Sequence, residues 1–223
     1  MKALIACEYS GIVRDAFLNR GYFAMSCDFL PTETLGPHYQ GDVRDILHLG
    51  WDAMICHPDC AYLCGSGLHW NKRGATVNGR PRAELTEEAL DFVRMLLNAP
   101  IPFIALENPV GCISTRIQPA SQYIQPHQFG HDASKKTGLW LKNLPLLQGT
   151  KDIPGRDVEW PPGSGKWVKR WANQTDSGQN RLAPSEDRWK DRSRTYEGWA
   201  EAMAEQWGPV IAAGNRDLLG EAA

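Results

Sequence analysis

Short apolar runs, each followed by polar residues, constrain the fold of this chain more than any other feature. The runs cover residues 2–7, 22–27, 52–56 and 101–106, and residues 12–20 have the spacing of an amphipathic helix. Ser10 is a plausible N-cap of that helix, and Gly21 is a plausible stop. Strands that alternate with helices through short loops predict an α/β fold. We expect a doubly wound, mostly parallel, Rossmann-like sheet with helices on both faces.

The remaining sequence contains regular elements and one irregular segment. Residues 86–98 form the clearest helix, with Thr86 as a possible cap, whereas residues 69–82 predict a mobile loop. A strand is expected at 136–141 and a closing helix at 197–207. Residues 150–187 are rich in Pro, Gly, Trp and charge and have no sustained period. We therefore expect a core at 1–149, a small irregular lobe at 150–187, and a C-terminal part at 188–223 that starts with a basic segment and completes the core with a helix.

Composition limits the classes of protein that fit. The chain has 223 residues, 42% of them hydrophobic and 22% charged, which suits one core with a small lobe. The net charge of -2 argues against a polycationic DNA-coating protein but allows a local basic face. Neither a membrane-length apolar stretch nor a secretory signal is evident, so a soluble, cytoplasmic protein is expected. The spacing of Cys56, Cys60 and Cys64 does not fit the usual zinc pairs, so no metal site is expected.

Two chemically useful groups follow neighbouring apolar runs. Cys60 comes shortly after residues 52–56, and Glu107 comes directly after residues 101–106. In open α/β sheets, ligands bind in the crevice at the carboxyl ends of the strands. Cys60 is either a nucleophile, with its thiolate stabilised by a helix N-terminus or a cation, or a small buried side chain, and Cys64 is a rival thiol. Glu107 either donates a proton, which requires a raised pKa, or ties down its loop.

A cofactor site is suggested by the order of three polar positions. The turn Glu8-Tyr9-Ser10-Gly11 can present backbone N–H groups to a ligand carboxylate or phosphate. Asp28 follows the second run, about twenty residues on, where an acid can accept hydrogen bonds from a ribose. Asp42 is placed to contact an adenine amino group. Each acid alone also fits a helix cap or a solvated loop.

Cations and aromatic rings alternate in two later stretches. Residues 166–171 and 188–194 mix Lys and Arg with Trp, a combination that suits phosphates and stacked bases. Nearby acids dilute this charge, and a solvated surface is the alternative interpretation. His57 is left open as a base, a base-contacting donor or a polar loop residue.

These motifs together, in this order, resemble those of the cytosine-5 DNA methyltransferases, and more closely those of a compact, phage-associated branch. The matching segments are Glu8-Tyr9-Ser10-Gly11-Ile12, Asp28, Gly41-Asp42-Val43, His57-Pro58-Asp59-Cys60 and Glu107-Asn108-Pro109-Val110. Lys135 and Lys136 are similar in placement to the strand carrying the family's Gln-x-Arg-x-Arg element. Residues 125–131 and 187–195 look like signatures of the compact branch.

The resemblance implies a class I, S-adenosylmethionine-dependent methyltransferase that acts on a flipped cytosine in DNA. It implies that Cys60 adds covalently to the base, assisted by Glu107 and Asn108. The cofactor contacts that it implies are Glu8, Tyr9, Ser10, Gly11, Ile12, Asp28, Asp42, Val43 and Pro58. The DNA or substrate contacts are His57, Lys135, Lys136, Arg192 and Arg194. A monomer without membrane attachment is favoured, in a host cytoplasm if the chain is phage-encoded.

Departures from the family pattern keep other functions open. Asp59 replaces a proline beside the thiol and would raise its pKa by like-charge repulsion. The Gln-x-Arg-x-Arg pattern itself is not clear, no Gly-Asn motif is obvious near the C-terminus, and only residues 150–187 could replace a target-recognition domain. The alternatives are a catalytically inactive DNA-binding or decoy protein, an amino (N4/N6) DNA methyltransferase, and a free-nucleotide methyltransferase.

Overall fold

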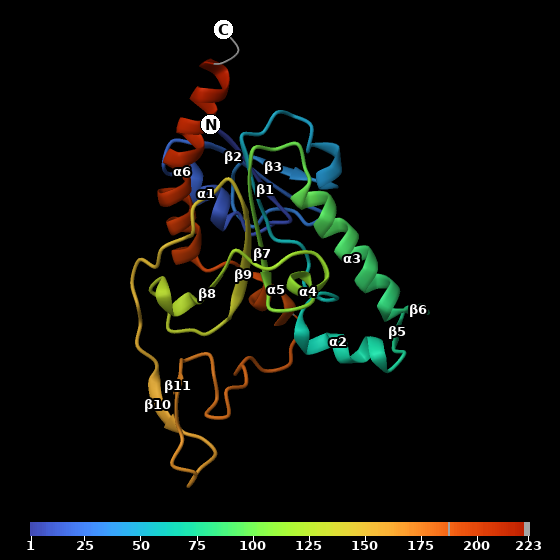
Figure 1. Ribbon diagram of the computed structural model, residues 1–223, viewed down its shortest axis with the longest axis vertical. Helices are drawn as coiled ribbons and strands as arrows, with labels where there is room; N and C mark the ends of the chain where they lie inside the picture. Colours follow the sequence, from blue (N-terminus) through green and yellow to red (C-terminus); the bar gives the residue numbers. More distant parts are fainter. Residues whose placement is uncertain (187, 221–223) are drawn as a thin grey trace.

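Seven strands form one central sheet in the computed structural model, which describes residues 1–186 and 188–220 (Figure 1). The strand order is β3-β2-β1-β4-β7-β9-β8. The first five strands are mutually parallel, and β9 and β8 add an antiparallel pair at one edge. This arrangement confirms the expected mostly parallel α/β sheet. The strands are β1 (Lys2–Ala6), β2 (Phe23–Asp28), β3 (His38–Gln40), β4 (Ala53–Cys56), β7 (Phe103–Pro109), β8 (Gln122–Ile124) and β9 (Thr137–Lys142).

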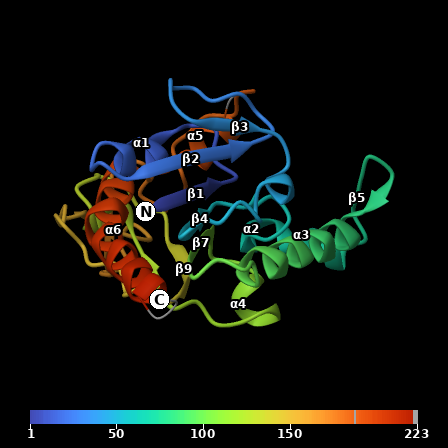
Figure 2. The same ribbon diagram turned by 90° about the horizontal axis from the view of Figure 1, so that it is seen from above.

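Helices cover both faces of the sheet, as the sequence predicted. α1 (Ile12–Leu18) and α6 (Glu197–Gly220) lie on one face, and α3 (Arg82–Leu97) lies on the other (Figures 1 and 2). In β1, Ile5 packs into the core on the α1/α6 side, whereas Leu4 packs into the core on the α3 side. Both side chains are fully buried. A strand buried on both faces needs apolar residues at every position, which explains the uninterrupted apolar run.

The closing helix α6 is anchored by a stripe of large side chains. Trp199, Met203, Trp207 and Ile211 are fully buried and recur every four residues, so they face α1 and the sheet together. The expected end at residue 207 is wrong, because the helix continues to Gly220. Pro209 lies on the exposed side of α6, where the helix tolerates it.

The expected mobile loop at residues 69–82 is largely structured. It contains the second half of α2 (Gly65–Lys72) and a hairpin of β5 (Thr76–Val77) and β6 (Arg80–Pro81). α3 begins at Arg82, four residues before the expected cap at Thr86. Instead of capping a helix, the Thr86 hydroxyl donates to the carbonyl of Tyr62 at 3.1 Å and so anchors the loop that carries Cys60.

The strand that carries Glu107 is longer than expected. β7 runs to Pro109 because β9 pairs with it as far as Pro109 and Thr137. Glu107 and Asn108 are therefore among the last residues of a paired strand, and do not lie in the loop after it. This pairing fixes the backbone beneath both side chains.

Residues 150–186 form an irregular lobe around one antiparallel ribbon, β10 (Arg156–Glu159) and β11 (Trp167–Arg170). The lobe lies below the sheet in Figure 1. The division into three parts stays a prediction, and its boundary residue 187 and residues 221–223 lie outside the described chain. In the described part, no helix combines the length and the apolar character needed to cross a membrane. The short helical elements are η1 (Val43–Asp45), α4 (Ile113–Arg116), η2 (Pro126–Gln128) and α5 (Arg188–Ser193).

Candidate functional site

The strand order reverses between β1 and β4, and the candidate residues gather at the carboxyl ends of those strands and of β7. The turn after β1 begins near Glu8, and the loop after β4 carries His57 and Cys60. Cys56 of β4 pairs with Leu106 of β7, so the next residues, His57 and Glu107, are neighbours across the sheet. A reversal of this kind is where α/β sheets open a ligand crevice.

His57 and Glu107 form a buried pair at these strand ends. His57 Nδ1 lies 3.0 Å from Glu107 Oε2, and each side chain is 8% exposed. Burial alone would raise the pKa of Glu107, but the hydrogen bond from His57 and the positive charge of Lys135 hold that pKa below its ordinary value. The raised pKa that the proton-donor interpretation of Glu107 requires is therefore not found in the free protein, because two partners that are distant in sequence lower it.

Several polar atoms beside this pair lack partners among the described residues. They are His57 Nε2, Glu107 Oε1 and Asn108 Oδ1, all fully buried. The amide nitrogen of Asn108 donates to the carbonyl of Pro58 at 2.7 Å, which fixes the direction of the orphaned oxygen. A buried polar atom without a partner costs about 1–3 kcal/mol, so three in one cluster indicate a polar ligand.

Two thiols interact in the loop after β4. The side chains of Cys60 and Cys64 are hydrogen-bonded to each other. Cys64 is the N-cap of α2, and its sulfur lies 3.2 Å from Ser66 Oγ. The Cys60 thiol, Ser66 Oγ and the first N–H groups of α2 donate to Cys64 and lower its pKa to about 5. The same bond, followed by burial, raises the pKa of Cys60.

The helix N-terminus that was expected to stabilise a Cys60 thiolate thus serves Cys64. Asp59 adds a small upward effect on the pKa of Cys60, in the direction expected from like charge, and Lys135 opposes it. The Asp59 carboxylate accepts a hydrogen bond from the N–H of Ala61 at 2.9 Å, which shapes the loop. Within the described residues, no group of three or more His, Cys, Asp or Glu side chains could hold a metal ion.

Lys135 connects the two halves of the site. Its positive charge opposes the raised pKa of Cys60 and contributes to the lowered pKa of Glu107. Its Nζ also lies 5.8 Å from the ring centre of Trp199. Lys136 differs, because its Nζ lies over the ring of Tyr123 at 4.7 Å. Of the two predicted lysines, only Lys135 has a recorded interaction with this cluster.

The first turn does not present its helix N–H groups to a ligand in the way that was expected. The buried Glu8 carboxylate accepts from the N–H of Val13 at 2.7 Å and from that of Arg14 at 3.4 Å. Ser10 Oγ donates to Glu8 at 3.2 Å and accepts from the N–H of Ile12 at 3.3 Å. Burial raises the pKa of Glu8, although His57 opposes this shift. Glu8 and Ser10 therefore satisfy the start of α1 internally.

Gly11 and Tyr9 complete the turn in different ways. Gly11 has φ +77°, and a Cβ there would lie 2.2 Å from Thr34 Oγ1, so only glycine fits. The Tyr9 hydroxyl lies 3.3 Å from Ser193 Oγ, and its ring centre lies 6.2 Å from that of Trp189. α5 therefore covers this turn.

Asp28 and Asp42 differ in the hydrogen-bond partners that their carboxylates have within the protein. Asp28 Oδ1 accepts from the N–H of Leu30 at 2.9 Å, and the backbone N–H of Phe29 also favours the ionised carboxylate. Burial raises the pKa of Asp28. Asp42 uses both oxygens on Arg44, which supports its alternative interpretation as a cap. Val43 is 4% exposed and packs in the core.

The other predicted contacts lie at varied distances from the crevice. Arg194 forms an ion pair with Glu33 at 2.5 Å, and Arg192 is exposed in the last turn of α5. Pro58 is buried beneath Asn108, and Ile12 begins α1 against the core. Cys64, which the sequence interpretation named only as a rival thiol, is the candidate residue with the lowered pKa. Its place before Gly65-Ser66-Gly67 is compatible with an N-cap, but the helix that follows was not predicted.

Comparisons with known proteins give limited information. No protein-family model matches the chain, and no curated protein matches it. Among solved structures, the chain is similar to an E. coli structure described as a candidate DNA modification methyltransferase encoded within a prophage. The TM-score is 0.42 and the sequence identity 12%, over 70% of this chain and 52% of the other. The chain thus spans about half the length of that structure.

Proposed function

We propose that this protein transfers a methyl group from S-adenosylmethionine to carbon 5 of cytosine in DNA, through a covalent adduct with Cys60. The observation that carries the proposal is the cluster of orphaned atoms on His57, Glu107 and Asn108 beside the thiol pair, where the strand order reverses. A flipped base has a polar edge that needs such partners, and the chemistry needs a nucleophilic sulfur next to them.

The cofactor fits the crevice best through its adenosine half. The carboxylate of the half-buried Asp28 is suited to accept from a ribose hydroxyl. The helix N–H groups of Val13 and Arg14 are occupied by Glu8, so the cofactor's carboxylate is assigned to other donors. When bound, the cofactor supplies an electrophilic methyl group.

Glu107 and Asn108 provide recognition of the pyrimidine edge. Cytosine presents an amino group that donates hydrogen bonds, and carboxylates are its usual partners. Glu107 is held in its ionised form in the free protein, so its orphaned Oε1 accepts from that amino group. The proton needed at ring nitrogen 3 comes from the His57–Glu107 pair, in which His57 Nδ1 and Glu107 Oε2 lie 3.0 Å apart.

Cys60 carries the covalent step. Its S–H proton passes to the Cys64 sulfur that accepts its hydrogen bond, and the sulfur of Cys60 bonds to ring carbon 6. The electron pair of the 5,6 double bond would then take the methyl group, whose bond to the sulfonium sulfur of the cofactor breaks and leaves that sulfur as a neutral thioether. Loss of the carbon 5 proton to water restores the double bond and expels Cys60, which takes back its proton from Cys64, and the proton on ring nitrogen 3 returns to the His57–Glu107 pair. Lys135 stabilises negative charge on both the sulfur and Glu107.

The test is trapping on DNA that contains 5-fluorocytosine, with cofactor present. Fluorine cannot leave as a proton, so a thiol adduct becomes permanent and appears as a denaturant-resistant band. We expect the band with the wild type and with Cys112→Ser, a matched buried thiol outside the cluster, and no band with Cys60→Ser. Methyl transfer without any trapped adduct would instead indicate an amino methyltransferase, and binding without methyl transfer would indicate a decoy protein.

A further inference from the structure

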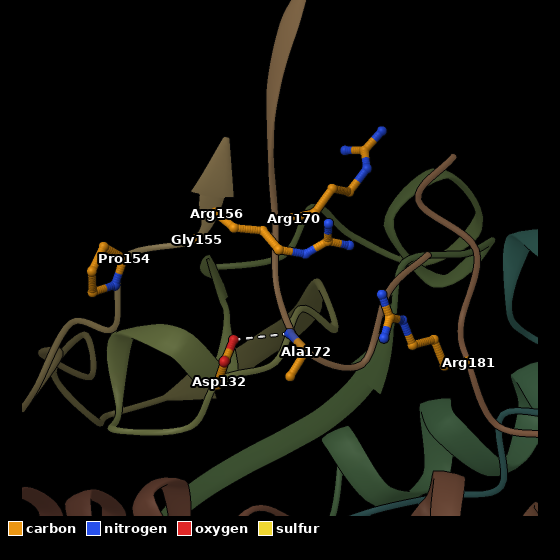
Figure 3. Close-up of a pocket in the computed structure, with 7 residues that line it drawn as sticks. All are labelled: Asp132, Pro154, Gly155, Arg156, Arg170, Ala172 and Arg181. Atoms are coloured by element: carbon orange, nitrogen blue, oxygen red, sulfur yellow. Dashed lines mark hydrogen bonds between the residues drawn. The ribbon is translucent and has the colours of Figure 1, made fainter. Parts of the chain in front are cut away.

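Two adjoining hollows lie on the lobe, apart from the crevice. The first has a volume of about 580 Å³ and is lined by Asp132, Arg156, Arg170 and Arg181 among others (Figure 3). The second has a volume of about 670 Å³ and is lined by Trp160 and again by Arg181. Arg181 therefore lines both hollows. Figure 3 shows Arg156 and Arg181 among the residues of the first hollow; Arg156 is the first residue of β10, and Arg181 belongs to the irregular segment after β11.

Two arginines of the first hollow lie close enough to repel each other. Arg156 of β10 and Arg170 of β11 are directly opposite in the antiparallel register. Like charges in that position destabilise a ribbon. Asp176 relieves part of the repulsion, since its carboxylate lies 2.7 Å from Arg156 Nη1 and its carbonyl accepts from Arg170 Nε at 3.0 Å. A bound anion would reduce the remaining electrostatic repulsion between Arg156 and Arg170.

Arg181 keeps its outer nitrogens available for that anion. Its Nε donates to the carbonyl of Gln174 at 2.8 Å, and its Nη atoms make no hydrogen bond within the described residues. Within the described residues, the Asp132 carboxylate forms no ion pair with Arg181, and it accepts from the N–H of Ala172 at 2.9 Å. Three guanidinium groups thus face two carboxylates, Asp132 and Asp176, and one positive charge is left over.

We propose that the lobe binds a nucleic-acid strand, with a phosphodiester held by Arg156, Arg170 and Arg181 and an adjacent base stacked on Trp160. Trp160 is 37% exposed and borders the second hollow, so a base can reach its ring. Guanidinium groups bind phosphate oxygens through paired N–H donors, and base stacking on tryptophan tolerates any sequence. This inference rests on the proposed function in taking DNA as the substrate.

The lobe is joined to the crevice by a short, well-bonded segment. Asn173 Nδ2 donates to the carbonyl of Ser134, and the N–H of Ser134 donates back to Asn173 Oδ1, both at 2.9 Å. Ser134 directly precedes Lys135, the cation shared by Cys60 and Glu107. A strand held on the lobe is therefore aligned with the site of chemistry.

The experiment measures binding of a fluorescein-labelled single-stranded DNA 12-mer by anisotropy over a range of salt concentrations. We expect Arg181→Gln to weaken binding about tenfold and to reduce the salt slope by about 0.7, the value for one lost phosphate contact on a single strand. Trp160→Ala should weaken binding by roughly fivefold to 150-fold, with the salt slope unchanged. The matched charge control is Arg20→Gln, because Arg20 lies at the far end of α1, paired with Glu201.

Conservative variants guard against misfolding. Arg181→Lys should keep most of the salt slope, and Trp160→Phe should keep most of the stacking, with wild-type melting temperatures. The inference is overturned if Arg181→Gln and Trp160→Ala bind DNA as Arg20→Gln does. It is also overturned if inorganic phosphate displaces DNA from the wild type and from Arg181→Gln equally.

Failure of this inference and failure of the proposed function give different results. If only the proposed function fails, Cys60→Ser retains methyl transfer or no adduct forms, while the lobe variants still lose DNA affinity. If only the lobe inference fails, the adduct forms and the lobe variants bind DNA normally.

Discussion

Replacing Cys64 by Ser tests where the negative charge of the thiol pair resides. The pKa of Cys64 is lowered from 9.0 to about 5 by donors from Cys60, Ser66 and the start of α2. At pH 7 an ordinary thiol of pKa 9.0 is about 1% ionised, whereas the lowered pKa of Cys64 leaves its thiol mostly ionised. Wild-type protein should therefore show one thiol that iodoacetamide alkylates rapidly at pH 7, with a rate that falls to half near pH 5.

Background alkylation of the other cysteines should be low at pH 7. Burial raises the pKa of the other four cysteines, Cys7, Cys27, Cys56 and Cys112. Peptide mass spectrometry at each pH locates the label.

The rapid reaction should disappear in Cys64→Ser and persist in Cys60→Ser, with its midpoint moved upward because one donor is lost. Cys60 in Cys64→Ser should titrate at a lower pH than in the wild type, since the bond to Cys64 is the largest cause of its raised pKa. If the rapid label instead vanishes in Cys60→Ser and survives in Cys64→Ser, the thiolate lies on Cys60 and the assignment is refuted.

Three further predictions concern stability, measured by urea unfolding. His57→Asn should cost about 3–5 kcal/mol at pH 7, because Glu107 loses its buried partner. Since folding lowers the pKa of Glu107, this contribution is present above its ordinary value of 4.5, and the deficit should shrink as the pH falls below that value. Glu8→Gln should stabilise the protein at pH 7 and have little effect below pH 4.5, because burial raises the pKa of Glu8 and makes its charged form costly; an unchanged stability at pH 7 would contradict this. Trp207→Ala should cost about 3–5 kcal/mol at either pH, since its ring is fully buried, and a loss below 1 kcal/mol would show that α6 is not held by this stripe.

The sequence predicted the sheet well because each buried strand has its own local signature. β1 and β4 are apolar at almost every position, which is the pattern of strands covered on both faces. The helix α2 lacked such a signature. It contains Gly65 and Gly67, which weaken helix propensity, and it has no buried residue of its own. Contacts from α3 hold it instead, including the bond from Arg82 Nη1 to Asn71 Oδ1 at 2.6 Å.

The site residues could be found from the sequence, but their ionisation could not. Glu107 was identified by its place after an apolar run, and its burial was expected. The direction of its pKa shift depends on His57, fifty residues earlier, and on Lys135, which reaches the site from the segment before β9. Local sequence carries no information about such partners, so desolvation alone gave the wrong sign.

The pairing of β4 with β7 explains why the chemistry gathers where it does. Cys56 and Leu106 are partners in register, so the chain delivers His57 and Glu107 to adjacent positions at the edge of the sheet. The loop after β4 then has only three residues in which to bring Cys60 over the same edge, and the start of α2 fixes Cys64 beside it. Because β9 pairs with β7 up to Pro109 and Thr137, the segment that precedes β9 starts from the same end of the sheet, and the charge of Lys135 in that segment acts on both Cys60 and Glu107. The site is thus a consequence of strand order. If β4 and β7 were not paired in this register, His57, Cys60 and Glu107 would no longer lie close to one another.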